Sequence, residues 1–470
     1  MKESKHQEHQ KNSLQIMMKK AEVTAFLSLV FVLLVTFIGS VLDVTSLQIA
    51  KNYRRMDAER AIECMFAEYQ KELLEEYDIF ALDAGYESGE YSENLIHKRM
   101  EYYGMVNSES EIERIKFLSD KNGADFYGQA IQYMEHKYGI DSVREYMDLT
   151  GIFEKQQTEA KDYQEMEAEN SHLLEGLFKE SESQLPEEEN PIAYVDALKN
   201  LSILKLVMPD GKPVSEKQIS IDELPSHREV RKGYGQFQGQ KEKNGVTDRL
   251  LFAEYLLEHF FSAVDESEHV LDYELEYLLA GKRSERENLK IVTGKLMAVR
   301  MIANYAYLQG NAEKRAEAEA LALTLSAVAA SPQAAEAVAQ GILLAWAFGE
   351  SVMDLRSLLD GKKVPMLKDD GSWQLSLAGI MKLGETGKLQ DGMDVEEGLG
   401  YEDYLRMLVF MEKKEEISMR CLDLIEMNLQ KIQGLEFFKA DLCVTKIELL
   451  CECSFRKGIR YTFPVLFEYQ

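Results

Sequence analysis

Two stretches of this sequence have residue types and spacings that are typical of catalytic sites. Ser202-Ile-Leu-Lys205 has the S-x-x-K spacing of an acylating serine and its lysine, but no S-x-N or K-[ST]-G element follows it. Gly233-Tyr-Gly-Gln-Phe-Gln-Gly239 misses the spacing of a dinucleotide-binding loop by one residue. It also does not follow a strand and open a helix, as such a loop does. We interpret the first stretch as a chance match and the second as an ordinary loop.

Metal-binding chemistry is suggested by three positions at which glutamate precedes histidine. None of them has the second histidine, four residues on, that a zinc-binding helix needs: Glu135-His136, Glu258-His259 and Glu268-His269. His6 and His9 have no further ligands near them in the sequence. The run from Pro186 to Pro191 has adjacent rather than alternating acids, so it is typical of a solvated linker rather than a calcium loop. We therefore predict no catalytic residue, no metal site and no cofactor, and we expect that the protein is not an enzyme.

The cysteines do not form a recognisable pattern either. The chain has five at irregular spacing, an odd number that does not suit a disulfide framework: Cys64, Cys421, Cys443, Cys451 and Cys453. Cys451-Glu-Cys453 lacks the two-residue gap of a zinc knuckle. In a strand, these two side chains would point to the same face. We favour buried free thiols over a disulfide.

The composition limits the class of protein. The 470 residues are 45% hydrophobic, which is enough for two or three packed domains, and the formal net charge is −28. The first 22 residues hold five lysines and three glutamates, so the rest of the chain carries all of the excess acid. Such a charge repels nucleic acid and anionic membrane surfaces. We predict that nucleic acid is not a partner.

The elements that would position any site begin with the apolar stretch from Val23 to Leu42. These twenty residues carry no charge and lie between Glu22 and Asp43. A helix of this length spans about 30 Å, the thickness of the hydrocarbon layer. A cleaved signal peptide is the alternative, but its apolar core would be shorter and would end at a cleavage site. A buried soluble helix suits the stretch less well, because large apolar residues cover all of its faces. We predict a membrane anchor over residues 21–44.

The basic residues predict the orientation of this anchor. Lys19 and Lys20 lie directly before the apolar stretch, whereas the first basic residue after it is Lys51. Basic residues near a membrane span tend to stay in the cytoplasm. We therefore expect residues 1–20 to form a flexible cytoplasmic tail, and the domain after the anchor to lie outside the cell membrane.

The helical pattern continues beyond the membrane. No glycine or proline occurs between Gly39 and Gly85, which predicts one helix from about Glu22 to about Tyr77. Residues 45–80 would then be a helical stalk. Its apolar stripe must be covered by the domain or by a partner helix, because an isolated helix of this kind is not stable in water.

The remaining chain predicts an α+β fold that is mainly α. We predict that residues 81–190 form a mixed α/β lobe, with a strand near 112–117 and an acidic helix before a linker. We predict an irregular connector with short strands over residues 191–245 and a helical domain over residues 246–440. Residues 441–470 are predicted to form a terminal β-hairpin, which makes a small antiparallel sheet. Within the helical domain, Ala316 to Ala330 and Pro332 to Leu359 are alanine-rich. We interpret them as a helical hairpin rather than a second membrane span, because polar residues interrupt them.

Five segments together resemble a family of uncharacterised single-span proteins whose genes lie in tight-adherence (Tad, or Flp) pilus loci of Gram-positive gut bacteria: Val23 to Phe31, Glu68 to Asp83, Glu276 to Lys282, Gly361 to Pro365 and Tyr401 to Arg406. That family is similar to the TadE and TadG pseudopilins. The resemblance implies a structural or assembly protein of a Tad-type pilus or secretion apparatus. It also implies that the N-terminal helix contacts the membrane and other proteins of the apparatus.

The sequence departs from processed pilins at one place. Those proteins have a glycine before the cleavage point and a glutamate five residues into the mature chain, whereas here Lys20 precedes Ala21 and Ala25 replaces the glutamate. This difference argues against cleavage by a prepilin peptidase. Two other functions stay open: an envelope-facing binding or sensory module without catalytic activity, and an unrecognised cell-wall enzyme.

Overall fold

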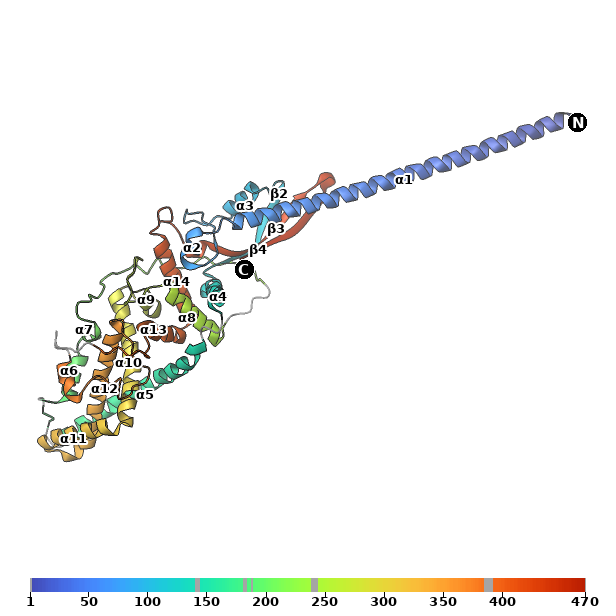
Figure 1. The fold of residues 1–470 in the computed structure, drawn as a ribbon. Coiled ribbons are helices and arrows are strands. Elements are labelled where there is room, and N and C mark those ends of the chain that lie inside the picture. Colours follow the sequence, from blue (N-terminus) through green and yellow to red (C-terminus); the bar gives the residue numbers. More distant parts are fainter. Residues whose placement is uncertain are drawn as a thin grey trace. The chain divides into compact units, whose positions relative to one another are not determined.

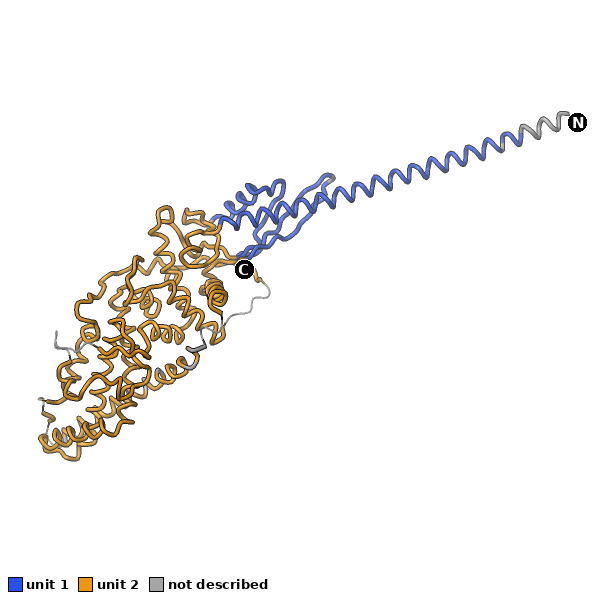
Figure 2. The backbone as a smooth tube through the Cα atoms, in the orientation of Figure 1, with its two compact units in different colours: residues 1–68, 92–115, 446–468 blue, residues 69–91, 116–445, 469–470 orange. Residues whose placement is uncertain are grey.

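The fold was obtained as a computed structural model, which describes residues 2–139, 144–180, 184–186, 189–237, 244–383 and 392–469. The chain forms two compact units (Figure 2). Unit 1 contains residues 1–68, 92–115 and 446–468, and unit 2 contains residues 69–91, 116–445 and 469–470. The fold is mainly α with a small antiparallel sheet, as the sequence predicts.

The first element is a single long helix, α1, from Lys2 to Phe66 (Figure 1). It confirms the predicted apolar helix and its continuation, but both ends differ from the prediction. The expected flexible tail is helical from Lys2 onward, because nothing in its sequence stops the helix. The predicted stalk helix ends eleven residues before Tyr77, and the chain resumes as α2, Lys71–Tyr77.

Tertiary contacts rather than helix-breaking residues cause this break. The Gln70 N–H donates to the Ala81 carbonyl at 2.9 Å, which turns the chain back on itself. In unit 1, the Phe66 ring stacks on Phe467 with 4.2 Å between ring centroids and fixes the end of α1. In unit 2, Asp78 ends α2 in the left-handed conformation, with φ of 53°. The sequence between Gly39 and Gly85 carries no local signal for this turn.

The sheet has four strands: β1 Leu82–Asp83, β2 Ser108–Phe117, β3 Cys443–Ser454 and β4 Arg460–Glu468. Strand β3 pairs with all of the others, and its antiparallel register with β4 runs from Lys446↔Glu468 to Ser454↔Arg460. The predicted terminal hairpin and the predicted strand near residues 112–117 are both confirmed, and β3 of the hairpin pairs with that strand, β2. Among the described residues β4 pairs with β3 alone, and an edge strand of this kind tolerates Pro464. In unit 1, α1 packs on β4 and on α3, Glu93–Tyr102.

The cysteines are free, as predicted, and four of the five are buried. Cys451 and Cys453 alternate with half-buried residues along β3 and face the same side of the sheet. Burial raises the pKa of the Cys451 thiol to about 12. It also raises the pKa values of Cys421 and Cys443 well above the ordinary range. These thiols are therefore packing groups with little thiolate at neutral pH.

Unit 2 is built around α12, Ala335–Leu359, whose side chains are buried over almost its whole length. Helix α11, Ala312–Val328, lies antiparallel to it across a 3-10 turn at Pro332–Ala334, so the predicted helical hairpin is confirmed. The other helices are α4 Asp120–Tyr138, α5 Arg144–Glu180, α6 Pro191–Lys199, α7 Ile203–Val207, α8 Val246–His259, α9 Glu274–Ala280, α10 Glu285–Gly310, α13 Tyr401–Met411 and α14 Lys414–Leu429.

The predicted connector, residues 191–245, differs from the expectation of short strands. It begins with α6 and α7, and its described remainder is irregular, with an isolated bridge between Gln218 and Ser284. The Asn190 side chain accepts a hydrogen bond from the Ile192 N–H at 3.1 Å, and Pro191 follows as the first helical residue. Asparagine before proline favours the start of a helix. This local signal outweighs the prolines and glycines that come later in the connector.

Candidate functional site

The apolar part of α1, residues 23–42, is exposed along its whole length when a single copy of the chain is considered without membrane or partner. Phe26, Phe31 and Phe37 are each 65–68% exposed. Among the described residues, α1 is the one helix that is long and apolar enough to cross a membrane. Its hydroxyl groups are satisfied within the helix; for example, Thr36 Oγ1 donates to the Val32 carbonyl at 2.8 Å. This suits a lipid environment, which offers polar groups no other partner.

Beyond the apolar part, α1 has two different sides. Ala58, Ala61 and Ile62 are buried against unit 1. On the other side, Ile49, Tyr53 and Met56 are 50%, 63% and 61% exposed. These three lie four and three residues apart and therefore share one side of the helix, which we call the open face of α1.

This part of α1 is held firmly within unit 1. Arg54 Nη1 donates to the Val106 carbonyl at 2.9 Å, and Lys51 Nζ lies 4.8 Å from the centre of the Tyr461 ring. The open face is thus presented by a helix that its own unit fixes from behind. Three large apolar side chains in contact with water on a rigid helix are typical of a surface that another helix covers.

Unit 2 contains a buried cluster of two cations and two anions. Lys368 Nζ lies 2.6 Å from both Glu350 Oε1 and Asp354 Oδ1, and Arg300 Nη2 lies 2.9 Å from Asp354 Oδ2. All four side chains are fully buried. Burial acts to raise the pKa of Asp354, but Arg300 and Lys368 hold it below its usual value. Because the charges balance, we interpret this cluster as structural: it joins α10, α12 and the loop that holds Lys368.

We predict that Lys368→Met lowers the free energy of unfolding of unit 2 by about 3 kcal/mol or more, because two buried carboxylates lose a shared cation. Urea unfolding followed by tryptophan fluorescence measures this, since the two tryptophans of the chain, Trp346 and Trp373, both lie in unit 2. Arg283→Met is the control. It breaks the exposed pair with Asp222 and should cost less than about 1 kcal/mol. Equal effects of the two changes would contradict the prediction.

Other buried carboxylates hold the loops of unit 2. Glu285 Oε1 accepts from the backbone N–H groups of Asp272 and Tyr273, at 2.5 and 2.9 Å. Glu276 Oε1 accepts from the Ala263 N–H at 3.0 Å and from the Tyr401 hydroxyl at 2.8 Å. Burial raises the pKa of Glu276 to about 7. These carboxylates hold the backbone of loops in unit 2.

Glu276 should make stability depend on pH. Its folded-state pKa is raised, so its neutral form stabilises the fold below the unfolded pKa of about 4.5, and this contribution disappears as the pH rises through about 7. The full change is about 3 kcal/mol. We expect Glu276→Gln to remove this part of the pH dependence, because the amide oxygen can still accept both hydrogen bonds. Urea unfolding between pH 5 and 8 measures it, and parallel profiles for the two proteins would contradict it.

The motifs that the sequence suggested have structural roles. Ser202 stands at the start of α7, and its carbonyl accepts from the Lys205 N–H at 2.9 Å. The Lys205 side chain is exposed. The Gly233 N–H donates to the Asp120 carboxylate at 2.9 Å, so this glycine anchors an irregular loop, as interpreted. Gly239 lies outside the described residues.

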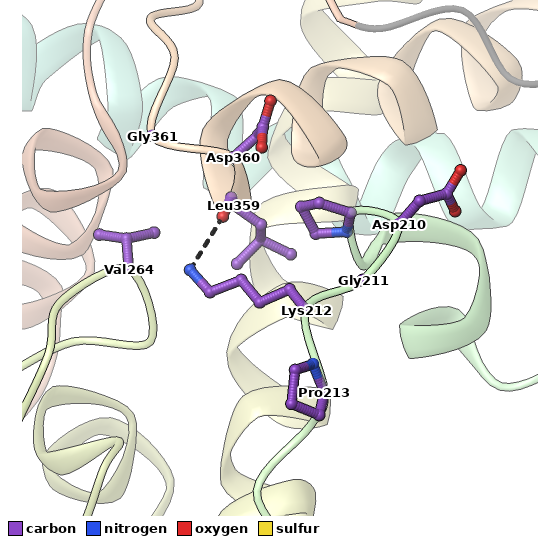
Figure 3. Close-up of a pocket in the computed structure, with 9 residues that line it drawn as sticks. Asp210, Gly211, Lys212, Pro213, Val264, Leu359, Asp360 and Gly361 are labelled. Atoms are coloured by element: carbon purple, nitrogen blue, oxygen red, sulfur yellow. Dashed lines mark hydrogen bonds between the residues drawn. The ribbon is translucent and has the colours of Figure 1, made fainter.

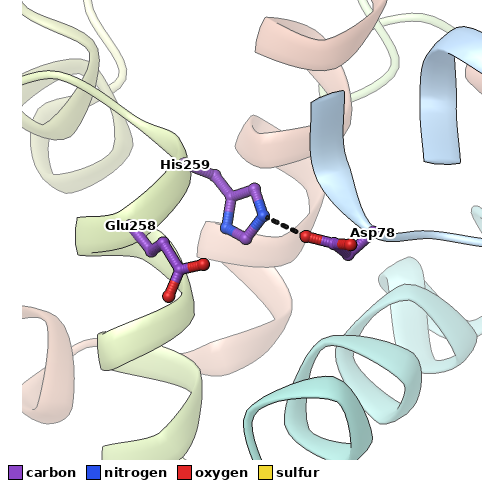
Figure 4. A group of neighbouring side chains, drawn as sticks. All are labelled: Asp78, Glu258 and His259. Carbon is purple, nitrogen blue, oxygen red and sulfur yellow. Dashed lines mark hydrogen bonds and ion pairs between the residues drawn. The ribbon is translucent and has the colours of Figure 1, made fainter. Parts of the chain in front are cut away.

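The three glutamate–histidine pairs have separate surroundings. Glu135 and His136 are exposed on α4. The His269 ring lies 2.9 Å from the buried Glu274 carboxylate. His259 Nε2 lies 3.1 Å from Asp78 Oδ2, with Glu258 beside it (Figure 4). Sequence spacing gives no signal for this last cluster, because Asp78 precedes His259 by 181 residues.

A pocket of about 340 Å³ lies where the connector meets the end of α12 (Figure 3). Lys212 Nζ donates to the Leu359 carbonyl across it at 3.3 Å, and Asp210 and Asp360 line its rim. This volume is at the low end for ligand pockets, and the lining has no aromatic side chain. Since Lys212 is already bonded, the pocket offers few convergent polar groups to a ligand.

Comparisons with known proteins give one match. The sequence model described as "Family of unknown function (DUF5702)" matches residues 181–455, which are more than half of the chain. This region contains α6 to α14 and all of β3. No curated protein and no solved structure matches.

Proposed function

We propose that this chain, which belongs to the family of unknown function DUF5702, is a membrane-anchored structural or assembly component of a Tad-type pilus or secretion apparatus. One observation supports this most strongly. The apolar helix α1 continues without a break into a stalk that is fixed from behind and carries the open face. The resemblance to pseudopilins implies that such a helix packs against other helices in and above the membrane.

The proposal places unit 2 outside the cell membrane and residues 1–20 in the cytoplasm. Lys19 and Lys20 are the basic residues nearest to the apolar stretch and keep the N-terminal side inside. The excess acid lies in the part of the chain after α1's apolar stretch, where it favours a soluble, well-separated domain. Lipid and other helices of the apparatus are then the partners of α1.

The open face should contact a protein of the apparatus in the cell. In a Cys64→Ser background, we expect cysteines at Ile49, Tyr53 and Met56 to form crosslinks to a pilus or secretion component. Gln48→Cys is the matched control, because Gln48 is exposed but lies on another side of α1. Mass spectrometry of the crosslinked species identifies the partner. Equal yields from Gln48→Cys, or capture of no such component, would count against the proposal.

The orientation can be measured separately. In intact protoplasts with the Cys64→Ser background, a membrane-impermeant maleimide should label Asn94→Cys, which lies exposed on α3. It should label Asn12→Cys only after the membrane is permeabilised. The reverse pattern would place α3, and with it the chain that follows the apolar stretch, in the cytoplasm and rule out the proposed topology. Labelling of both sites before permeabilisation would indicate that α1 does not span the bilayer.

A further inference from the structure

The ring of His259 is held in one orientation at the end of α8. It stacks on Tyr255 with 4.2 Å between ring centroids and lies edge-on to Tyr133, and its side chain is 6% exposed. Nδ1 lies 2.9 Å from the Tyr255 carbonyl oxygen. A carbonyl oxygen only accepts, so Nδ1 carries the hydrogen. The free electron pair of a neutral ring is then on Nε2.

That electron pair points at a negative charge. Nε2 lies 3.1 Å from Asp78 Oδ2, and an ionised carboxylate also only accepts (Figure 4). Two acceptors at this distance need a cation between them, either a proton on Nε2 or a metal ion. Histidines that bind metals typically donate their other N–H to a backbone carbonyl, as His259 does to Tyr255.

Glu258 supplies a third ligand. The nearest ligand atoms of Asp78, Glu258 and His259 all lie within 4.8 Å of one another. Around a tetrahedral zinc ion with bonds of about 2.0–2.1 Å, ligand atoms are about 3.3 Å apart. The ligand atoms of Asp78 and His259 lie 3.1 Å apart, which is close to this separation. Glu258 would move closer on binding, since the three ligand atoms lie within 4.8 Å of one another. The Glu258 side chain is 25% exposed, so an ion can enter from solvent.

Other charged and polar groups around the cluster come from α4. Lys137 Nζ contacts Glu258 Oε1, and the hydroxyl groups of Tyr133 and Tyr138 donate to the same carboxylate at 3.2 and 3.0 Å. With neutral His259 and one lysine, the two carboxylates leave a net charge of −1. This charge favours a divalent cation. Lys137 opposes the binding of a cation, but its side chain is 38% exposed and can move into solvent.

We propose that Asp78, Glu258 and His259 bind one divalent transition-metal ion that joins the end of α2 to the end of α8. An imidazole with two carboxylates suits Zn²⁺ or a similar ion better than Mg²⁺ or Ca²⁺, which prefer oxygen ligands alone. The three ligands leave a fourth position for water. The inference depends only on unit 2 and is independent of the pilus proposal.

The test uses the full chain without a histidine tag, purified in detergent and treated with a chelator. We expect calorimetry with Zn²⁺ to show one site that is lost, or weakened at least about tenfold, in His259→Gln and in Asp78→Asn. His136→Gln is the control and should bind as the original protein does, since His136 is exposed on α4. Zn²⁺ should raise the unfolding temperature seen by tryptophan fluorescence, and Mg²⁺ should not. Equal binding by His259→Gln and the original protein would overturn the proposal.

Lys137→Met separates the metal site from a simple ion-pair network. Removal of a cation beside Glu258 should tighten Zn²⁺ binding by about threefold or more. A cluster that consists only of a protonated His259 between carboxylates would bind Zn²⁺ weakly, with or without Lys137. Weak Zn²⁺ binding that Lys137→Met leaves unaltered would therefore also overturn the proposal. Glu258→Gln is the milder ligand change if Asp78→Asn fails to fold, and circular dichroism checks the fold of each variant.

Discussion

An uncharged helix of twenty residues with all of its large side chains exposed cannot stay in water, and the rest of the molecule follows from this constraint. Fourteen of the residues from Val23 to Leu42 are Leu, Ile, Val or Phe. On insertion scales they favour the bilayer by roughly 4 to 8 kcal/mol in total. No other described part of the chain covers them. The hydroxyl groups bonded within the helix remove the remaining cost of placing it in lipid.

An apolar helix of this kind needs a firm connection to folded structure, and unit 1 provides it. The stacked rings of Phe66 and Phe467 and the hydrogen bond from Arg54 fix the end of α1 to the sheet edge and loop of the same unit. Since the buried side of α1 is used for this purpose, the open face stays available. A helix that is rigid and apolar on its free side binds another helix with little loss of conformational entropy.

Local patterns predicted the elements whose signals are local. Some sequence patterns determine the structure of the residues next to them. These are the apolar period of α1, the alternation along β3 and β4, and the proline before α12. The break after Phe66 has no local signal, because it depends on the Gln70–Ala81 hydrogen bond and on the ring of Phe467, about four hundred residues later in the sequence. The connector differs from the prediction because its glycines and prolines follow two short helices, which begin at Pro191 and Ile203. Contacts between residues that are far apart in the sequence produce no periodic pattern of apolar and polar residues.

The same reasoning explains why the cluster at His259 could not be found from spacing, and why its position matters. Asp78 follows α2, the first helix after α1, and the chain enters unit 2 nine residues before it, at Tyr69. A force applied to α1 is carried covalently through α2. An ion bound by Asp78 and His259 would hold the end of α2 against α8, whose Tyr255 and Phe252 belong to the core of unit 2. Metal binding and mechanical attachment would then depend on the same few atoms, as in other proteins where metal ligation stabilises the folded state.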